Sequence, residues 1–147
     1  MSVLLCCPTS ALDVILSVAT HPSRSEAVCL LLNEYHCVRS SFVIAKAPRD
    51  LGSLTSALSG ICEALPWVRA VIFATLSNGS GTVPNAAEQI DFLDCRERFS
   101  VIGVDLIDWF ILNAGVAASV AEITDARSLW RHAGGSSGCA PVGASQA

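Results

Sequence analysis

The sequence predicts one α/β domain of the α+β kind, a mixed β-sheet flanked by helices, and three observations lead to this prediction. The chain has 147 residues, a length that suits a single hydrophobic core. Hydrophobic residues make up 52% of it and charged residues only 15%, with a mean hydropathy of +0.53, so a core is easily filled. Helical and strand patterns follow in the order helix, two strands, helix, strand, helix, two strands, which is typical of mixed sheets with helices on their faces.

The first half of the chain predicts a helix, a β-hairpin and a second helix. Thr9 or Ser10 can cap the first helix, and two strand-like runs, 26–33 and 37–45, are separated by a short polar turn. The second helix is expected to begin at Ser53 and to end before a proline. The apolar residues expected on the buried faces are Leu12, Ile15, Leu16 and Ala19 in the first helix and Leu54, Leu58, Ile61 and Leu65 in the second.

The middle of the chain predicts a buried strand followed by a third helix. The run 68–75 is almost continuously apolar, as expected for a strand that is covered on both faces. Asn85 and Glu88 have the spacing of a capping box, which predicts a helix from there to about Phe99. The residues expected to face the core from this helix are Ala86, Gln89 or Ile90, and Leu93.

Two strands, at 103–112 and 116–121, are expected to complete the sheet through a tight turn. A short helix is predicted at 125–132. The segment 134–147 is rich in Gly, Ser and Ala and is expected to be a disordered tail. The folded domain is therefore predicted to span 1–133.

The charge balance argues against direct binding to nucleic acids. The formal net charge is −4, Lys46 is the only lysine, and the arginines are spread along the chain. Nucleic-acid binders concentrate Lys and Arg because they neutralise phosphates, and no such cluster is found here. We also expect no membrane span, since no uninterrupted run of about 20 apolar residues occurs.

Seven cysteines occur without a Cys-x-x-Cys pair, and most of them lie within apolar runs. We therefore expect free, buried cysteines rather than disulfide or metal sites. The N-terminal residues lack the basic start of a signal peptide. Together these features predict a cytoplasmic protein in a reducing compartment.

The segment from Ala70 to Gly115, about a third of the chain, resembles a known family. Its parts are Ala70-Val71-Ile72-Phe73-Ala74, a Ser80-Gly81 loop, Asn85-Ala86-Ala87-Glu88, and Gly103-Val104-Asp105-Leu106-Ile107-Asp108 running on to Gly115. This order is similar to the second half of RadC-like JAB domains, a branch of the JAB/MPN metalloproteases. The resemblance implies a JAB/MPN domain with the cytidine-deaminase-like fold.

The family's zinc motif is His-x-His-x7-Ser-x2-Asp, in which two imidazoles and a carboxylate hold the metal. Laid without a gap on this chain, its positions fall at Leu76, Asn78, Ala86 and Gln89. None of these side chains suits Zn²⁺, because leucine and alanine offer no ligand atom and amides are weak neutral ligands. The resemblance thus implies a degenerate motif, with no catalytic residue, no metal and no cofactor.

Other features of the family's site are also changed. Asp108-Trp109 stands where the family has Asp-His, and the upstream general-base glutamate has two candidates here, Asp50 and Glu63. A residual polar pocket is predicted from Ser77, Asn78, Ser80, Gln89 and Asp108.

Further alternatives at this site stay open in the sequence. Ser77 or Ser80 could act as a nucleophile, although no Gly-x-Ser-x-Gly elbow is present, and the backbone of 78–81 could bind an anion. The three histidines are not spaced as a metal motif. Asp91, Asp94 and Glu97, beside Arg96 and Arg98, have the pattern of a solvated helix face.

The sequence thus favours a non-catalytic RadC/JAB-like domain that acts through protein–protein contacts or dimerisation, and a homo-oligomer or a protein partner is expected. The high apolar content agrees with such a role. One alternative is a zinc-dependent JAB-type peptidase or isopeptidase that uses unrecognised ligands. A second alternative is a RadC-type protein associated with DNA repair.

Overall fold

The computed structural model describes residues 3–4, 7–18, 26–45, 51–76, 83–113 and 116–130. Its strands are β1 (Val3–Leu4), β2 (Glu26–Leu32), β3 (Cys37–Ala45), β4 (Ala70–Leu76), β5 (Asp105–Asn113) and β6 (Val116–Ser119). Its helices are α1 (Pro8–Val18), α2 (Leu51–Ala64), α3 (Ala86–Val101) and α4 (Val120–Ile123). The strands form one sheet in the order β1-β3-β2-β4-β5-β6, in which β4 and β5 are parallel and the other neighbours antiparallel. The predicted mixed α/β architecture is confirmed.

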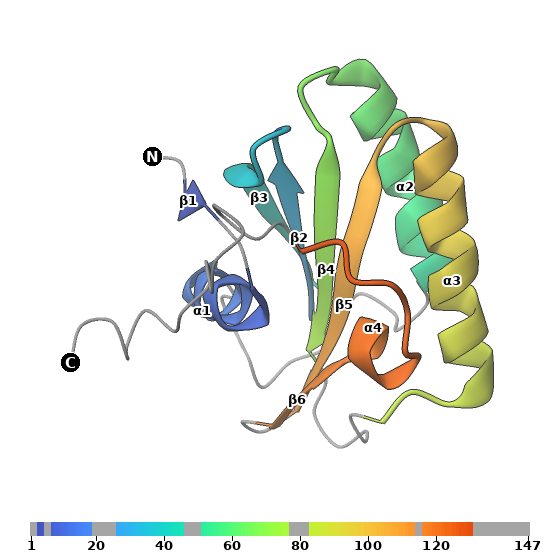
Figure 1. The fold of residues 1–147 in the computed structure, drawn as a ribbon. Helices are drawn as coiled ribbons and strands as arrows, with labels where there is room; N and C mark the ends of the chain where they lie inside the picture. The colour runs from blue at the N-terminus through green and yellow to red at the C-terminus, as the bar shows by residue number, and fades with distance from the viewer. Residues whose placement is uncertain are drawn as a thin grey trace.

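Helices cover both faces of the sheet. Figure 1 shows α2 and α3 side by side on one face and α1 on the other. Side chains from β2, β4 and β5 alternate between two cores, one shared with α2 and α3 and the other with α1 and residues Leu129 and Trp130. All of β2 is buried, as expected for a strand covered on both faces.

The turn between β2 and β3 is organised by Asn33. Its side-chain oxygen accepts hydrogen bonds from the backbone N–H groups of Tyr35 and Cys37, at 2.9 and 3.0 Å. His36 closes the turn with a φ of 61°, the left-handed conformation that short hairpin loops commonly need. The predicted hairpin is confirmed. His36 is part of its turn, at the end of the sheet where β2 ends.

Helix α3 begins with the predicted capping box. The Asn85 side chain accepts from the Glu88 N–H at 2.8 Å, and the Glu88 carboxylate accepts from the Asn85 N–H at 3.0 Å. The predicted buried stripe is wrong, however, because Ala86, Ile90 and Leu93 are exposed. The residues that face the core are Phe92, Cys95 and Phe99, on the opposite side of the helix.

Strand β5 contains a β-bulge beside β4. Leu106 is paired with Val71 and Asp108 with Ile72, so Ile107 has no partner in the parallel ladder. The bulge shifts the alternation of side chains along β5. As a result Leu106 and Trp109 face the α2–α3 core, whereas Ile107 and Phe110 face the α1 core.

The C-terminal elements differ from the prediction. Strand β6 ends at Ser119 rather than at 121, and the four-residue helix α4 follows directly. Residues 125–130 form a turn and an extended segment, so the part of the predicted 125–132 helix that the structure describes is not helical. The predicted tail, 134–147, lies outside the described residues.

The prediction of free cysteines is confirmed for Cys29, Cys37, Cys62 and Cys95. It is wrong for Cys7, which is disulfide-bonded. Burial raises the pKa of the Cys29 thiol to about 12 and that of Cys62 to about 11. Such thiols are unreactive core residues at neutral pH. Among the helices that the structure describes, none has the length and apolar character of a membrane span.

Candidate functional site

Three of the four sequence-predicted ligand positions lie at one end of the molecule, where β4 ends and α3 begins (Figure 1). Leu76 is the last residue of β4, Ala86 is the first residue of α3, and Gln89 lies in the first turn of that helix. Asn78, Ser77 and Ser80 lie outside the described residues. The loop that would complete this arrangement therefore stays a prediction, and so do a serine nucleophile or an anion site within it.

The start of α3 carries no metal-binding chemistry of its own. Ala86 is exposed and offers a methyl group, while the Gln89 side chain donates from Nε2 to the backbone oxygen of Pro84 at 3.2 Å. Asp91 and Asp94 are exposed, as predicted for a solvated face. Among the described residues, no group of three or more His, Cys, Asp or Glu side chains could hold a metal ion.

Of the two candidates for the general base, only Glu63 lies within the described residues. Asp50 lies outside the described residues. Glu63 is exposed and lines a hollow with Ile102 and Gly103, which follow the C-terminal end of α3. Ile102 follows Gln89 by thirteen positions, almost all of them helical, which corresponds to about 20 Å. Glu63 is therefore at the wrong end of the helix to serve a site beside Gln89.

Asp108 belongs to a different arrangement from the predicted pocket. It is paired with Ile72 in β4, four residues before Leu76, so about 13 Å of strand separates it from the end of β4. Its side chain is completely buried and is directed to the start of α4. The Ser119 hydroxyl donates to Asp108 Oδ2 at 2.5 Å, and the Ala121 N–H donates to Oδ1 at 3.0 Å.

Asp108 thereby fixes the junction between β6 and α4. Oδ1 also accepts from the Trp109 N–H at 2.7 Å, and Ser119, the N-cap of α4, accepts from the Glu122 N–H at 3.2 Å. A four-residue helix cannot persist on its own, because nucleating a helix is unfavourable. The chain from Ser119 to Glu122 is therefore held by this buried carboxyl group.

Burial raises the pKa of Asp108 to about 6, although the hydrogen bonds from Ser119, Ala121 and Trp109 and the charge of Arg96 oppose the shift. Desolvation disfavours the charged form of a buried acid. The proton, when present, can lie on Oδ2 and donate to the Ser119 oxygen, while Oδ1 keeps its two N–H donors. The network is satisfied in both protonation states.

Arg96 reaches from α3 to the same strand. Its guanidinium donates to the backbone oxygens of Leu106 at 3.0 Å and Ile107 at 2.8 Å, and to the oxygen of Arg127 at 2.8 Å. Strand β6 pairs with residues 110–113 of β5, so within the described part of the chain Leu106 and Ile107 have no neighbouring strand on that side. Arg96 supplies the missing donors, because the bulge at Ile107 leaves two successive carbonyl groups within its reach.

No local pattern in the sequence identifies the roles of Arg96 and Asp108. The charge pattern around Arg96 predicts a solvated helix face, but Arg96 is half-buried and lies over the Phe92 ring at 5.0 Å, and burial lowers its pKa. The only sign for Asp108 in the sequence is its place in the middle of a mostly apolar strand. Its partners lie 11 and 13 residues away, beyond any local pattern.

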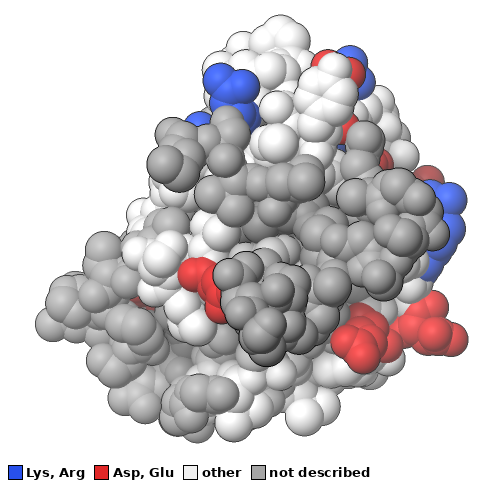
Figure 2. Space-filling view, turned by 60° about the vertical axis from the view of Figure 1, so that its left-hand side comes forward, with Lys and Arg blue, Asp and Glu red and all other residues white. Residues whose placement is uncertain are grey.

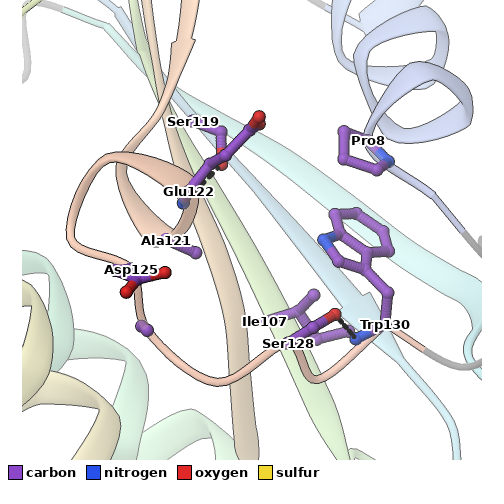
Figure 3. A pocket seen from close by; sticks show the side chains of 9 residues that line it. Pro8, Ile107, Ser119, Ala121, Glu122, Asp125, Ser128 and Trp130 are labelled. Atoms are coloured by element: carbon purple, nitrogen blue, oxygen red, sulfur yellow. Dashed lines mark hydrogen bonds between the residues drawn. The ribbon is translucent and has the colours of Figure 1, made fainter.

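A cavity of about 270 Å³ opens beside this junction. Figure 3 shows Glu122 and Asp125 on one side of it, Pro8 and Trp130 on the other, and Ile107 and Ser128 at its lower edge. The Trp130 ring packs against Phe110 with a centroid distance of 6.4 Å. The cavity thus combines apolar walls with two exposed carboxylates.

Asp125 ends α4 in a left-handed conformation, with a φ of 55°. Its N–H donates to the Glu122 oxygen at 3.2 Å, and the Ala126 N–H donates to the Ala121 oxygen at 3.0 Å. These two bonds form a Schellman motif, in which glycine is the usual residue at this position. The chain tolerates Asp there because its short side chain is among those that adopt this conformation.

We expect Asp125→Gly to leave the free energy of unfolding within about 0.5 kcal/mol of the wild type, because the relief of backbone strain offsets the larger entropy of the unfolded chain. Asp125→Val should lower it by about 1–2 kcal/mol, since a β-branched residue disfavours a positive φ. Urea unfolding of both variants measures the difference. Equal stability of the two variants would show that the left-handed conformation is not maintained.

On the face shown in Figure 2, acidic side chains lie mostly in the lower half, and basic ones form separate small groups above and along the right edge.

In comparisons with known proteins, no family model matches the sequence and no curated protein matches it.

Proposed function

We propose that this chain is a non-catalytic RadC/JAB-like domain that acts through contacts with other protein chains, including a second copy of itself. The observation that carries the proposal is the chemistry at the end of β4 and the start of α3. Leu76 and Ala86 offer no ligand atoms, and the Gln89 amide donates a hydrogen bond to the backbone of Pro84. In an active JAB domain these positions hold imidazole, hydroxyl and carboxylate groups.

The order of the elements supports the family assignment in this proposal. A buried strand, β4, leads through a loop into α3, and a parallel strand, β5, then continues into an antiparallel partner, β6. The same order underlies the resemblance in the sequence. Because folds host many functions, this support concerns architecture, and the function depends on the site chemistry.

The outward face of α3 supports a role in protein contacts. Ile90, Leu93 and Val101 have exposed fractions of 59%, 45% and 82%, and all three lie opposite the buried face of the helix. Exposed apolar residues that share one helix face are typical of surfaces that bind other chains.

If a second copy binds this face, an Ile90→Glu, Leu93→Glu variant should self-associate more weakly than the wild type. Sedimentation equilibrium at several protein concentrations measures the difference.

We predict that the protein purified without chelators contains less than about 0.1 zinc per chain, as expected without a site of ordinary affinity. A fourfold variant, Leu76→His, Asn78→His, Ala86→Ser and Gln89→Asp, should gain zinc affinity, because it restores the family's ligands at their spacing. Elemental analysis and Zn²⁺ titration of the two proteins provide the measurement. Stoichiometric, tight zinc in the wild type, with peptidase activity, would establish the zinc-dependent hydrolase instead.

Two further parts of the proposal concern location and nucleic acids. A cytoplasmic location is proposed from the cysteine pattern, and the disulfide at Cys7 is the observation against it, because cytosolic proteins seldom keep disulfides.

Direct DNA contact is not proposed, given the net charge of −4. A salt-dependent mobility shift with duplex DNA would support the role in DNA repair instead.

A further inference from the structure

The cavity beside α4 has the size of a site for one long side chain. Its volume of about 270 Å³ lies at the small end of the roughly 300–1,000 Å³ typical of ligand pockets, which is room for one long side chain. Pro8, Ile107 and Ala126 give it apolar surface, and Trp130 adds an aromatic wall opposite Glu122 (Figure 3). Such walls suit the alkyl stem of a side chain whose polar end stays at the rim.

The charge of the cavity defines the charge of its ligand. Glu122 and Asp125 are exposed members of the lining, and no Lys, Arg or His is among the nine described residues that line it. Both carboxylates also have no ion-pair partner within the described ranges. A cation in the cavity can therefore pair with two carboxylates and lie against the Trp130 ring, the aromatic surface that cations prefer.

We infer that this cavity binds a basic side chain, arginine or lysine, presented by a partner protein. The alkyl stem would lie along Pro8 and Ile107, and the cationic end would lie between Trp130 and the carboxylates of Glu122 and Asp125. The choice of a protein as the source of the side chain rests on the proposed function. The binding site itself rests on the cavity and its charges.

The test uses the intact chain, labelled with ¹⁵N, and the acetylated, amidated peptide Gly-Arg-Gly. The chain has three tryptophans, so three indole N–H signals are expected, and a Trp130→Phe variant assigns the one from the cavity. We expect the Trp130 signal to shift saturably with the peptide, whereas that of Trp109, which is buried and donates to Thr75, should stay in place. No saturable shift of the Trp130 signal in a folded protein would overturn the inference.

Matched controls establish the role of charge. A Glu122→Gln, Asp125→Asn variant should bind at least about tenfold more weakly, a loss of about 1.4 kcal/mol. An Asp91→Asn, Asp94→Asn variant removes the same charge from the outward part of α3 and should bind as the wild type does. The same peptide with citrulline in place of arginine is neutral and should not bind. Equal binding of the citrulline peptide, or equal losses in both variants, would contradict a cation site.

This result is separable from the test of the proposed function. Zinc content depends on the end of β4 and the start of α3, and self-association depends on the outward face of α3. Neither measurement depends on the residues around Trp130. If the wild-type protein contains no zinc and does not bind the peptide, only the cavity assignment is overturned. Peptide binding by a protein that carries stoichiometric zinc would keep the cavity and reject the non-catalytic role.

Discussion

Replacing Asp108 by alanine is expected to lower the free energy of unfolding by about 3 kcal/mol, one of the two largest effects of single substitutions that we predict. The substitution leaves the N–H groups of Trp109 and Ala121 buried without their acceptor, and each such group costs about 1–3 kcal/mol. It also removes the partner of the Ser119 hydroxyl. Urea unfolding measures the loss, and hydrogen exchange should locate it at 119–126.

The isosteric variant Asp108→Asn provides the control and a pH test. Its oxygen can accept from the same two N–H groups, and its NH₂ group can donate to Ser119, so the variant keeps the network without a charge. We expect it to be as stable as the wild type at pH 7, or more stable by on the order of 1–3 kcal/mol. A loss at pH 7 as large as that of Asp108→Ala would contradict a role that depends only on hydrogen bonding.

The pH dependence follows from the direction of the shift. Burial raises the pKa of Asp108 to about 6, above its value of 3.8 in an unfolded chain, so the folded state binds more protons between these two values. The contribution of Asp108 to stability is therefore fully present below about pH 4 and is lost as the pH rises through about 6. The stability difference between Asp108→Asn and the wild type should grow over this range and be constant above it.

Arg96→Ala is the second substitution with a large expected effect, a loss of about 3 kcal/mol in the free energy of unfolding. It removes three hydrogen bonds from a charged donor, two of them to backbone oxygens of β5, and it also removes the contact with the Phe92 ring. Arg96→Lys should recover only part of the loss, since one ammonium group cannot match the planar guanidinium.

Arg98 provides a matched control on the same helix. It is exposed, and its guanidinium donates to the Ser56 hydroxyl at 3.1 Å. Exposed contacts of this kind contribute little, so Arg98→Ala should change the free energy of unfolding by less than about 0.5 kcal/mol. Similar losses for Arg96→Ala and Arg98→Ala would mean that the contacts of Arg96 with β5 are not formed in solution.

Local patterns in the sequence were sufficient for several elements. The apolar run before Asn33 and the polar turn after it predict the hairpin, which the structure confirms. Asn85 and Glu88 predict the start of α3 because a capping box involves only residues three apart. The continuous apolar run 68–75 likewise predicts that β4 is buried on both faces, which the structure confirms for residues 70–75. In each case the determining interactions are local or depend only on periodicity.

Helix α3 shows where such reasoning fails. Its sequence contains two apolar stripes, one with Ile90 and Leu93 and the other with Phe92, Cys95 and Phe99. Periodicity alone does not select between them. Packing against the sheet selected the stripe with two phenylalanines, whose rings bury more surface, and Phe99 contacts Phe73 at a centroid distance of 5.9 Å.

The sequence by itself determined the mixed α/β class of the fold and most of its elements. Only the tertiary structure decided which face of α3 is buried, how the β5 bulge meets Arg96, and why Asp108 lies in the core. Each of these depends on groups brought together from distant parts of the chain. The cavity beside α4 does too, because Pro8, Ile107 and Trp130 all line it. Side-chain periodicity carries no information about such partners, because their energies arise from burial and long-range hydrogen bonds.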